Sequence, residues 1–273
     1  SDRCKIKLVE NSMIIVGGGI GGLAAALACG QAGARPQVLE RAATFSEVGA
    51  GIQMGPNVTR TLHAWGLAED LKAIGFAPRK LEAKDTQTGQ VIGSLPLGQR
   101  SLDTYGAPYV TVHRADLHRV LLQKLMRSGL AQLHLDSEVE AVQQAADGIQ
   151  ISGTSLPASL TEFSQFSAMV GADGLWSATR QFVVPRTTPR VTGLLAYRAL
   201  LPMQFLPEKL RLQDVNVWLG PRLHAVLYPV QCGECLNLVV VVQGQPPANL
   251  DDWDHAGHKE ELDRAMGPIH ADL

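Results

Sequence analysis

The sequence has no surplus of charge of either sign. Its 273 residues include 24 basic and 26 acidic side chains, which gives a formal net charge of -2. Proteins that attract nucleic acid or an anionic membrane surface need a basic excess, and this composition does not provide one. The charge balance argues against nucleic-acid and membrane partners and favours a protein that acts on a small molecule.

Cysteine and aromatic residues are also scarce. Four scattered cysteines are too few to hold a chain of this length together with disulfides, so we expect a reducing, cytoplasmic location. Cys232 and Cys235 have the spacing of half a zinc site, but a second pair is missing, so we predict no metal. Glycine, in contrast, is plentiful at 27 residues, as in layered α/β enzymes with many tight turns.

The chain also lacks a continuous apolar run that resembles a membrane helix. Residues 11–34 carry no charge and follow Arg3, Lys5 and Lys7, an order that resembles the start of a signal peptide. Five glycines interrupt the middle of this stretch, where a signal or membrane segment would place leucines. We therefore interpret the stretch as the buried core of a globular domain.

That stretch contains the pattern of a βαβ unit. The apolar residues 13–16 predict a strand buried on both faces, the alanine-rich residues 23–32 predict a helix, and residues 37–40 predict the next strand. A glycine-rich loop lies between the first strand and the helix. This is the context that a dinucleotide-binding loop requires.

The loop has the fingerprint spacing Gly17-x-Gly19-x-x-Gly22. Gly17 would make the tight turn, Gly19 would let the backbone approach a pyrophosphate, and Gly22 would allow close packing of helix on sheet. The phosphates would lie at the positive end of a helix that begins near Ile20. Glu40, at the end of the second strand, would accept both hydroxyls of an adenosine ribose and repel a 2′-phosphate. This half-site favours FAD or NAD over NADP.

The rest of the chain predicts a second sheet. Residues 80–97 are strand-like with a turn at Thr88-Gly89, and the pattern changes to alternating strands after Pro185. Elsewhere before Pro185 we predict helices at 56–65 and 115–126 and strands at 133–135, 139–142, 149–151 and 168–172. The strands predicted after Pro185 are 194–200, 215–219, 224–230 and 236–242.

These elements predict an α/β fold with two domains. The first is a Rossmann-like domain that binds FAD and NAD(P), over residues 1–79 and 104–185. The second is an antiparallel β-sheet substrate domain over 80–103 and 186–252, and residues 253–273 would begin a further segment.

A second motif separates flavoenzymes from dehydrogenases. The run from Val170 to Arg180, VGADGLWSATR, resembles the Asp-Gly signature of the class A flavin-dependent aromatic hydroxylases. The chain also resembles the family, in family order, at residues 47–53, Pro56-Asn57, residues 112–117 and Tyr228-Pro229. The resemblance extends over the chain from Met13, is closest to the salicylate and 3-hydroxybenzoate hydroxylases, and implies a fold like that of p-hydroxybenzoate hydroxylase.

The resemblance implies which residues hold the cofactors. The glycine loop and Glu40 would hold the ADP half of FAD, Arg114 would reach the flavin phosphates or the ribityl chain, and Asp173 belongs to a motif implicated in both FAD and NAD(P)H binding. Taken alone, Arg114 is equally consistent with a surface arginine at a helix start, and Asp173-Gly174 with a plain turn. The further cofactor-binding residues that we predict are Arg41, Ala50 and Gly51.

Two residues of the second sheet are candidates for catalytic contact with a substrate. A neutral imidazole at His224 would take a phenolic proton and make the ring a better nucleophile. The guanidinium of Arg198 would hold a carboxylate through two hydrogen bonds. A hydrogen-bonded strand histidine and a salt-bridged sheet arginine remain open as alternatives.

The function implied by the resemblance is hydroxylation of a phenolic or aromatic acid. FAD, reduced by NADH or NADPH, would react with O₂ to form a flavin C4a-hydroperoxide that oxygenates the ring. The alternatives are an FAD- or NAD-dependent oxidoreductase without hydroxylation and a non-catalytic nucleotide-binding remnant. A homodimer is left open.

The family carries a third fingerprint, a Gly-Asp motif followed by a helix, and the sequence ends at Leu273 before it. From this we expect a shortened protein with weak or absent flavin binding and without hydroxylase activity.

Overall fold

The molecule is built as two compact units. Unit 1 comprises Ser1–Glu47 and His118–Pro189, and unit 2 comprises Val48–Leu117 and Arg190–Leu273. The computed structural model describes residues 12–45, 49–146, 148–161, 166–184, 187–246, 249 and 256–273.

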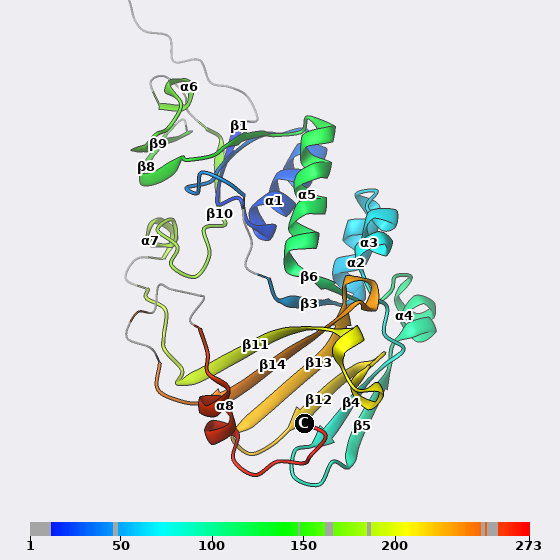
Figure 1. Cartoon of the computed structure of the whole chain (residues 1–273). Coiled ribbons are helices and arrows are strands. Elements are labelled where there is room, and N and C mark those ends of the chain that lie inside the picture. The colour runs from blue at the N-terminus through cyan, green and yellow to red at the C-terminus, as the bar shows by residue number, and fades with distance from the viewer. Residues whose placement is uncertain are drawn as a thin grey trace, which may run out of the picture. The chain divides into compact units, whose positions relative to one another are not determined.

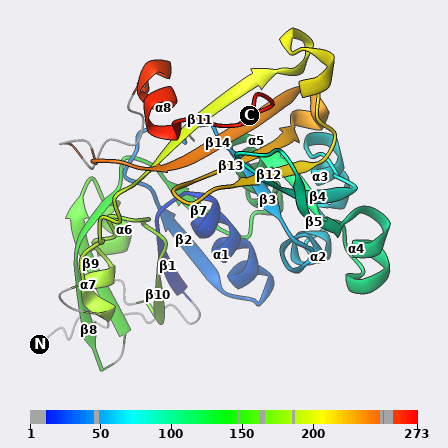
Figure 2. The same cartoon turned by 90° about the horizontal axis from the view of Figure 1, so that it is seen from below.

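Unit 1 contains a parallel sheet and a separate hairpin (Figure 1). Its elements are β1 Ser12–Val16, α1 Ile20–Gln31, β2 Arg35–Leu39, β7 Gln132–His134, β8 Glu138–Ala145, β9 Gly148–Thr154, α6 Ala158–Thr161, β10 Ala168–Gly171 and α7 Arg180–Val183. The parallel sheet has the order β10-β1-β2-β7, and β8 pairs with β9 in an antiparallel hairpin. Figure 2 shows α1 beside β1 and β2.

The apolar run of β1 explains its central position in this sheet. Ile14 and Ile15 are fully buried because β1 has a neighbouring strand on each side and packing on both faces. Ile14 belongs to one apolar cluster with Leu39 of β2, Ile151 of β9 and Phe166. The predicted βαβ unit is therefore confirmed, and its glycine loop lies between β1 and α1.

Unit 2 is organised around a six-stranded mixed sheet. Its elements are β3 Gly51–Met54, α2 Pro56–Ala64, α3 Ala68–Ile74, β4 Lys80–Asp85, β5 Val91–Pro96, α4 Gly98–Tyr105, β6 Val110–His113, β11 Leu194–Pro202, the 3₁₀ turns Met203–Phe205, Glu208–Leu210 and Gln231–Gly233, β12 Val215–Leu219, β13 Leu223–Val230, β14 Cys235–Gln243 and α8 Lys259–Met266. The strand order is β11-β14-β13-β12-β4-β5. Helix α5, Arg114–Ser128, starts in unit 2 and continues in unit 1.

The two faces of this sheet carry different side chains. On one face, Leu236 and Val240 of β14 pack in a cluster that includes Leu262 of α8, and Figure 1 shows α8 beside β14. On the other face lies the antiparallel pair β3–β6, where the Thr111 hydroxyl donates a hydrogen bond to the Pro229 carbonyl. Alternation along each strand therefore separates an apolar face from a face that carries polar groups.

The predicted strands and turn of residues 80–97 are confirmed as β4 and β5, and they join the second sheet. We predicted an antiparallel sheet, but β4 pairs with β12 in parallel, so the sheet is mixed. The prediction also missed the short strands β3 and β6 and the helices α3 and α4. The stripe predicted for α5 is present, since Leu117, Leu121 and Leu125 are buried.

The contact units and the predicted domains do not have the same limits. Residues 48–79 and 104–117 were assigned to the FAD domain but cluster with unit 2, where Gly51 and Thr111 bond to its sheet. The predicted boundary at Pro185 lies outside the described residues. The division into a cofactor domain and a substrate domain therefore stays a prediction.

The uncharged stretch forms β1, the glycine loop and α1, and α1 is 12 residues long. No helix in the part of the chain that the structure describes is both long and apolar enough to cross a membrane.

Candidate functional site

The backbone conformation and close contacts of the glycine loop in unit 1 leave no room for a side chain at Gly17 or Gly22. Gly17 has a φ of +107°, and a Cβ at this position would overlap the carbonyl of Ala172, just after β10. A Cβ on Gly22 would overlap the carbonyl oxygen of Gly17. The tight turn and the close packing predicted for these glycines are both present.

The first turn of α1 is suited to an anion. The helix begins at Ile20, as predicted, with Gly19 as its N-cap. Gly19 contributes no side-chain cap bond, and no acidic residue occupies the first turn. The N–H groups of this turn and the positive end of the helix dipole therefore meet no competing carboxylate of the helix. This donor set fits the pyrophosphate of a dinucleotide.

Glu40 is fixed directly beside the loop. One of its carboxylate oxygens accepts a hydrogen bond from Gly18 N at 2.7 Å, and the other accepts one from Ala42 N at 2.8 Å. An ionised carboxylate has about four lone-pair sites, so both oxygens keep capacity for ribose hydroxyls. Arg41 follows on the surface. The loop and the acid are thus brought together as the sequence predicted.

Asp173 braces the turn after β10. It accepts hydrogen bonds from the Ser177 hydroxyl at 2.6 Å, from the Thr179 hydroxyl at 2.6 Å and from Thr179 N at 3.0 Å. Burial acts to raise the pKa of Asp173, but these hydrogen bonds outweigh it and leave the pKa below its ordinary value. The ionised carboxylate therefore organises its own turn, and its contact with a cofactor stays a prediction.

Three further predicted residues meet in unit 2. Arg114 N donates to the carbonyl of Ala50 at 2.8 Å, which ties the start of α5 to the segment before β3. Gly51 N donates to Oδ1 of Asn237 on β14 at 2.7 Å. A Cβ on Gly51 would press into the Tyr228 ring and the Asn237 amide, so only glycine fits there. The Arg114 side chain is exposed at the start of the helix.

His224 and Arg198 lie on the same face of the sheet but not side by side. His224 of β13 is in register with Val241 of β14, which is in register with Ala196 of β11, and Arg198 lies two residues beyond Ala196. Two strand spacings and one two-residue step place their Cα atoms about 12 Å apart. Both side chains are exposed. Tyr228 shares this face.

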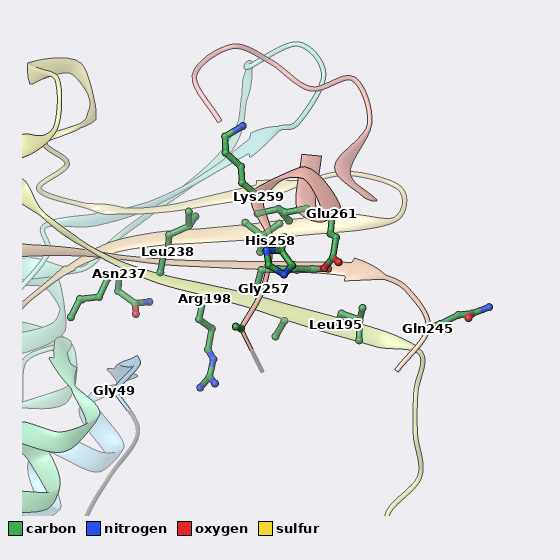
Figure 3. Close-up of a pocket in the computed structure, with 17 residues that line it drawn as sticks. Gly49, Leu195, Arg198, Asn237, Leu238, Gln245, Gly257, His258, Lys259 and Glu261 are labelled. Atoms are coloured by element: carbon green, nitrogen blue, oxygen red, sulfur yellow. The ribbon is translucent and has the colours of Figure 1, made fainter. Parts of the chain in front are cut away.

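Arg198 also lines a hollow of about 580 Å³ along the edge strand β11. Gly49 and Asn237 contribute to its wall, together with His258 and Glu261 at α8. Figure 3 shows the Arg198 guanidinium pointing away from His258 and Glu261. His224 is outside this lining.

A cluster of polar side chains in unit 2 had no predicted role, and its members are Gln53, Tyr109, Tyr228 and Asn237. The Tyr109 hydroxyl donates to Oε1 of Gln53, and burial, followed by the neighbouring Tyr109, raises the pKa of Tyr228 to about 12. The amide Nδ2 of Asn237 has no hydrogen-bond partner within the described residues, although the residue is 1% exposed. A lone asparagine inside the apolar run 236–242 was the available signal.

The chain is similar to several known proteins. The family described as FAD binding domain matches residues 10–261. The chain is 38% identical over 234 residues to 3-hydroxybenzoate 6-hydroxylase 1 of Aquipseudomonas alcaligenes, covering 85% of this chain and 58% of that protein. It is 35% identical over 262 residues to 3-amino-4-hydroxybenzoate 2-monooxygenase of Streptomyces cremeus, covering 95% of this chain and 62% of that protein.

A solved structure with the same fold is that of Klebsiella pneumoniae HpxO complexed with FAD and uric acid. Its TM-score is 0.79 at 23% identity, and the match covers 98% of this chain and 64% of that one. The chain thus spans about 60% of the length of the curated relatives that it matches.

Proposed function

The chain belongs to the class A family of FAD-dependent aromatic monooxygenases, and we propose that it binds the ADP half of FAD in unit 1 and contributes from unit 2 to the hydroxylation of a small aromatic acid. The observation that carries this proposal is the glycine loop at the start of α1, with no acid in the first turn and with Glu40 bonded beside it.

The loop and its surroundings supply the cofactor contacts. The N–H groups of Gly19 and of the first turn of α1, from Ile20 to Gly22, bind the pyrophosphate, and Glu40 accepts the ribose hydroxyls. Bound FAD supplies the redox chemistry with O₂, and NAD(P)H is the reductant. The further cofactor contacts that we propose are Arg41, Ala50, Gly51, Arg114 and Asp173.

The sheet of unit 2 supplies the substrate contacts. Arg198 binds a carboxylate through its forked N–H groups, and the His224 imidazole accepts a phenolic proton, which makes the ring a better nucleophile. The names of the relatives specify hydroxylated benzoates. A hydroxybenzoate is therefore the substrate class we propose, and a homodimer and a cytoplasmic location stay predictions.

Aerobic NAD(P)H oxidation in the presence of FAD tests the function. If the chain hydroxylates, 3-hydroxybenzoate or salicylate accelerates NAD(P)H oxidation and yields a product that gains one ¹⁸O atom from ¹⁸O₂, whereas cyclohexanecarboxylate, which lacks the ring π-system, has no effect. No acceleration by either phenol is the result that the shortened protein expected from the sequence would give. Oxidation that ignores every phenol would favour the oxidoreductase without hydroxylation. ADP binding without any flavin redox cycle would favour the nucleotide-binding remnant.

Replacing Glu40 with alanine is expected to weaken ADP binding by about 1–3 kcal/mol, because the ribose hydroxyls lose a charged acceptor. Glu40→Gln, which keeps one acceptor oxygen, is expected to lie between wild type and Glu40→Ala. Calorimetric titration measures the loss, and Glu138→Ala, an exposed acid of unit 1, is the matched control. Equal affinity of Glu40→Ala and wild type would remove Glu40 from the site.

A further inference from the structure

We propose that His118 is a positioning residue that aims the backbone of the glycine loop at the pyrophosphate, an inference that rests on the proposed FAD site. His118 lies on α5, is 5% exposed, and places Nε2 at 2.8 Å from the carbonyl oxygen of Gly18. A carbonyl oxygen can only accept a hydrogen bond, so Nε2 carries the proton and donates it. The bond joins the loop to a helix 100 residues away in the sequence.

Gly18 is held from both sides of its backbone. Glu40 accepts its N–H at 2.7 Å, while His118 donates to its carbonyl. The Phe45 ring closes the arrangement, since a Cβ on Gly18 would lie 2.5 Å from Phe45 Cε1. The rings of Phe45 and His118 also contact each other, with centroids 5.8 Å apart. We name these three side chains, Glu40, Phe45 and His118, the Gly18 bracket.

The Gly18 bracket fixes the direction of the Gly19 N–H, which is a donor for the pyrophosphate. In a planar trans peptide, the carbonyl of one residue and the N–H of the next point in opposite directions. Fixing the Gly18 carbonyl toward His118 therefore turns the Gly19 N–H to the opposite side. In the described part of the chain, this N–H donates to no backbone oxygen. Gly19 is the N-cap of α1, so its N–H is the donor that leads into the anion-binding turn.

Glycine loops need such a constraint more than other loops do. Glycine has the widest choice of backbone conformations, so a run of glycines loses much conformational entropy when it is ordered around a ligand. A donor from a rigid helix restricts the Gly18–Gly19 peptide before the ligand arrives. The effect should appear for ligands that carry phosphates and not for adenosine, which meets Glu40 but lacks the pyrophosphate.

Two substitutions of His118 by amide side chains of different length, glutamine and asparagine, test this role. The side-chain nitrogen of glutamine can occupy the position of Nε2, whereas that of asparagine ends one carbon earlier, near the position of Nδ1. We expect His118→Asn and His118→Met to bind ADP about tenfold more weakly than wild type, which corresponds to about 1.4 kcal/mol. We expect His118→Gln to bind ADP within about threefold of wild type. Adenosine affinity is expected to stay within about twofold in all three variants.

Calorimetric titration with ADP and with adenosine measures these affinities, and circular dichroism checks the fold of each variant. Gln123→Met, an exposed position on the same helix, is the matched control. Wild-type ADP affinity in His118→Asn would overturn the proposal, as would equal losses for ADP and adenosine or equal losses in the Asn and Gln variants. A wild-type protein that binds no ADP would overturn the cofactor site and this inference together.

Discussion

Replacing Gly19 with valine is expected to abolish ADP and FAD binding and to leave the protein folded. Gly19 has φ −71° and ψ −178°, an extended conformation that valine adopts readily, so the backbone gains no strain. A branched side chain at the N-cap would, however, occupy the space through which a pyrophosphate reaches the N–H groups of α1. Titration with ADP measures the loss, and thermal unfolding followed by circular dichroism measures the stability.

Gly17 provides the contrasting variant in the same loop. Its φ of +107° and the overlap of a Cβ with the Ala172 carbonyl predict that Gly17→Ala lowers the free energy of unfolding as well as ADP binding. The two variants therefore distinguish a loss of ligand access, which lowers ADP binding alone, from a loss of the loop conformation, which lowers both ADP binding and stability. A Gly19→Val variant that binds ADP like wild type would mean that the loop serves packing only.

Replacing His224 with alanine is expected to lower the rate of hydroxylation about 10²- to 10⁴-fold at neutral pH, because the phenolic proton loses its acceptor. FAD affinity is expected to stay unchanged. The loss should shrink as the pH rises toward the pKa of the substrate phenol, since the substrate then ionises without help. Product formation under saturating NAD(P)H, followed against pH, measures the effect.

Gln243→Ala is the control for His224, because Gln243 is an exposed polar residue on the same face of the sheet. It should leave both rate and pH profile unchanged. If His224→Ala keeps the wild-type rate, or loses rate equally at every pH, His224 is a strand histidine without a role in proton transfer.

Local patterns were sufficient to predict that the glycine loop and Glu40 lie together. The strand, the glycine loop and the helix are consecutive, and Glu40 follows one strand later, so the fingerprint itself specifies their proximity. His118 could not be found in this way. The apolar stripe that predicts α5 includes its neighbour Leu117, whereas the partner of His118 is Gly18, whose position relative to α5 follows only from the tertiary fold.

The same reason explains the elements that the sequence did not predict. Strands β3 and β6 have four residues each, too few to show a period, and they are held by distant partners such as Asn237 and Pro229. The parallel pairing of β4 with β12 joins segments far apart in the chain. Helix α4 begins with Gly98 and has a polar sequence, so it lacks the apolar stripe of α5.

Titration of FAD into the protein tests whether the glycine loop and Glu40 hold the ADP half of FAD. Flavin fluorescence and the visible absorption bands report binding. We expect saturable binding of one FAD per chain, even where the affinity is weak, together with displacement of FAD by ADP and loss of binding in Gly19→Val. An FAD signal that does not saturate up to millimolar concentration, or binding that neither ADP nor Gly19→Val affects, would contradict it.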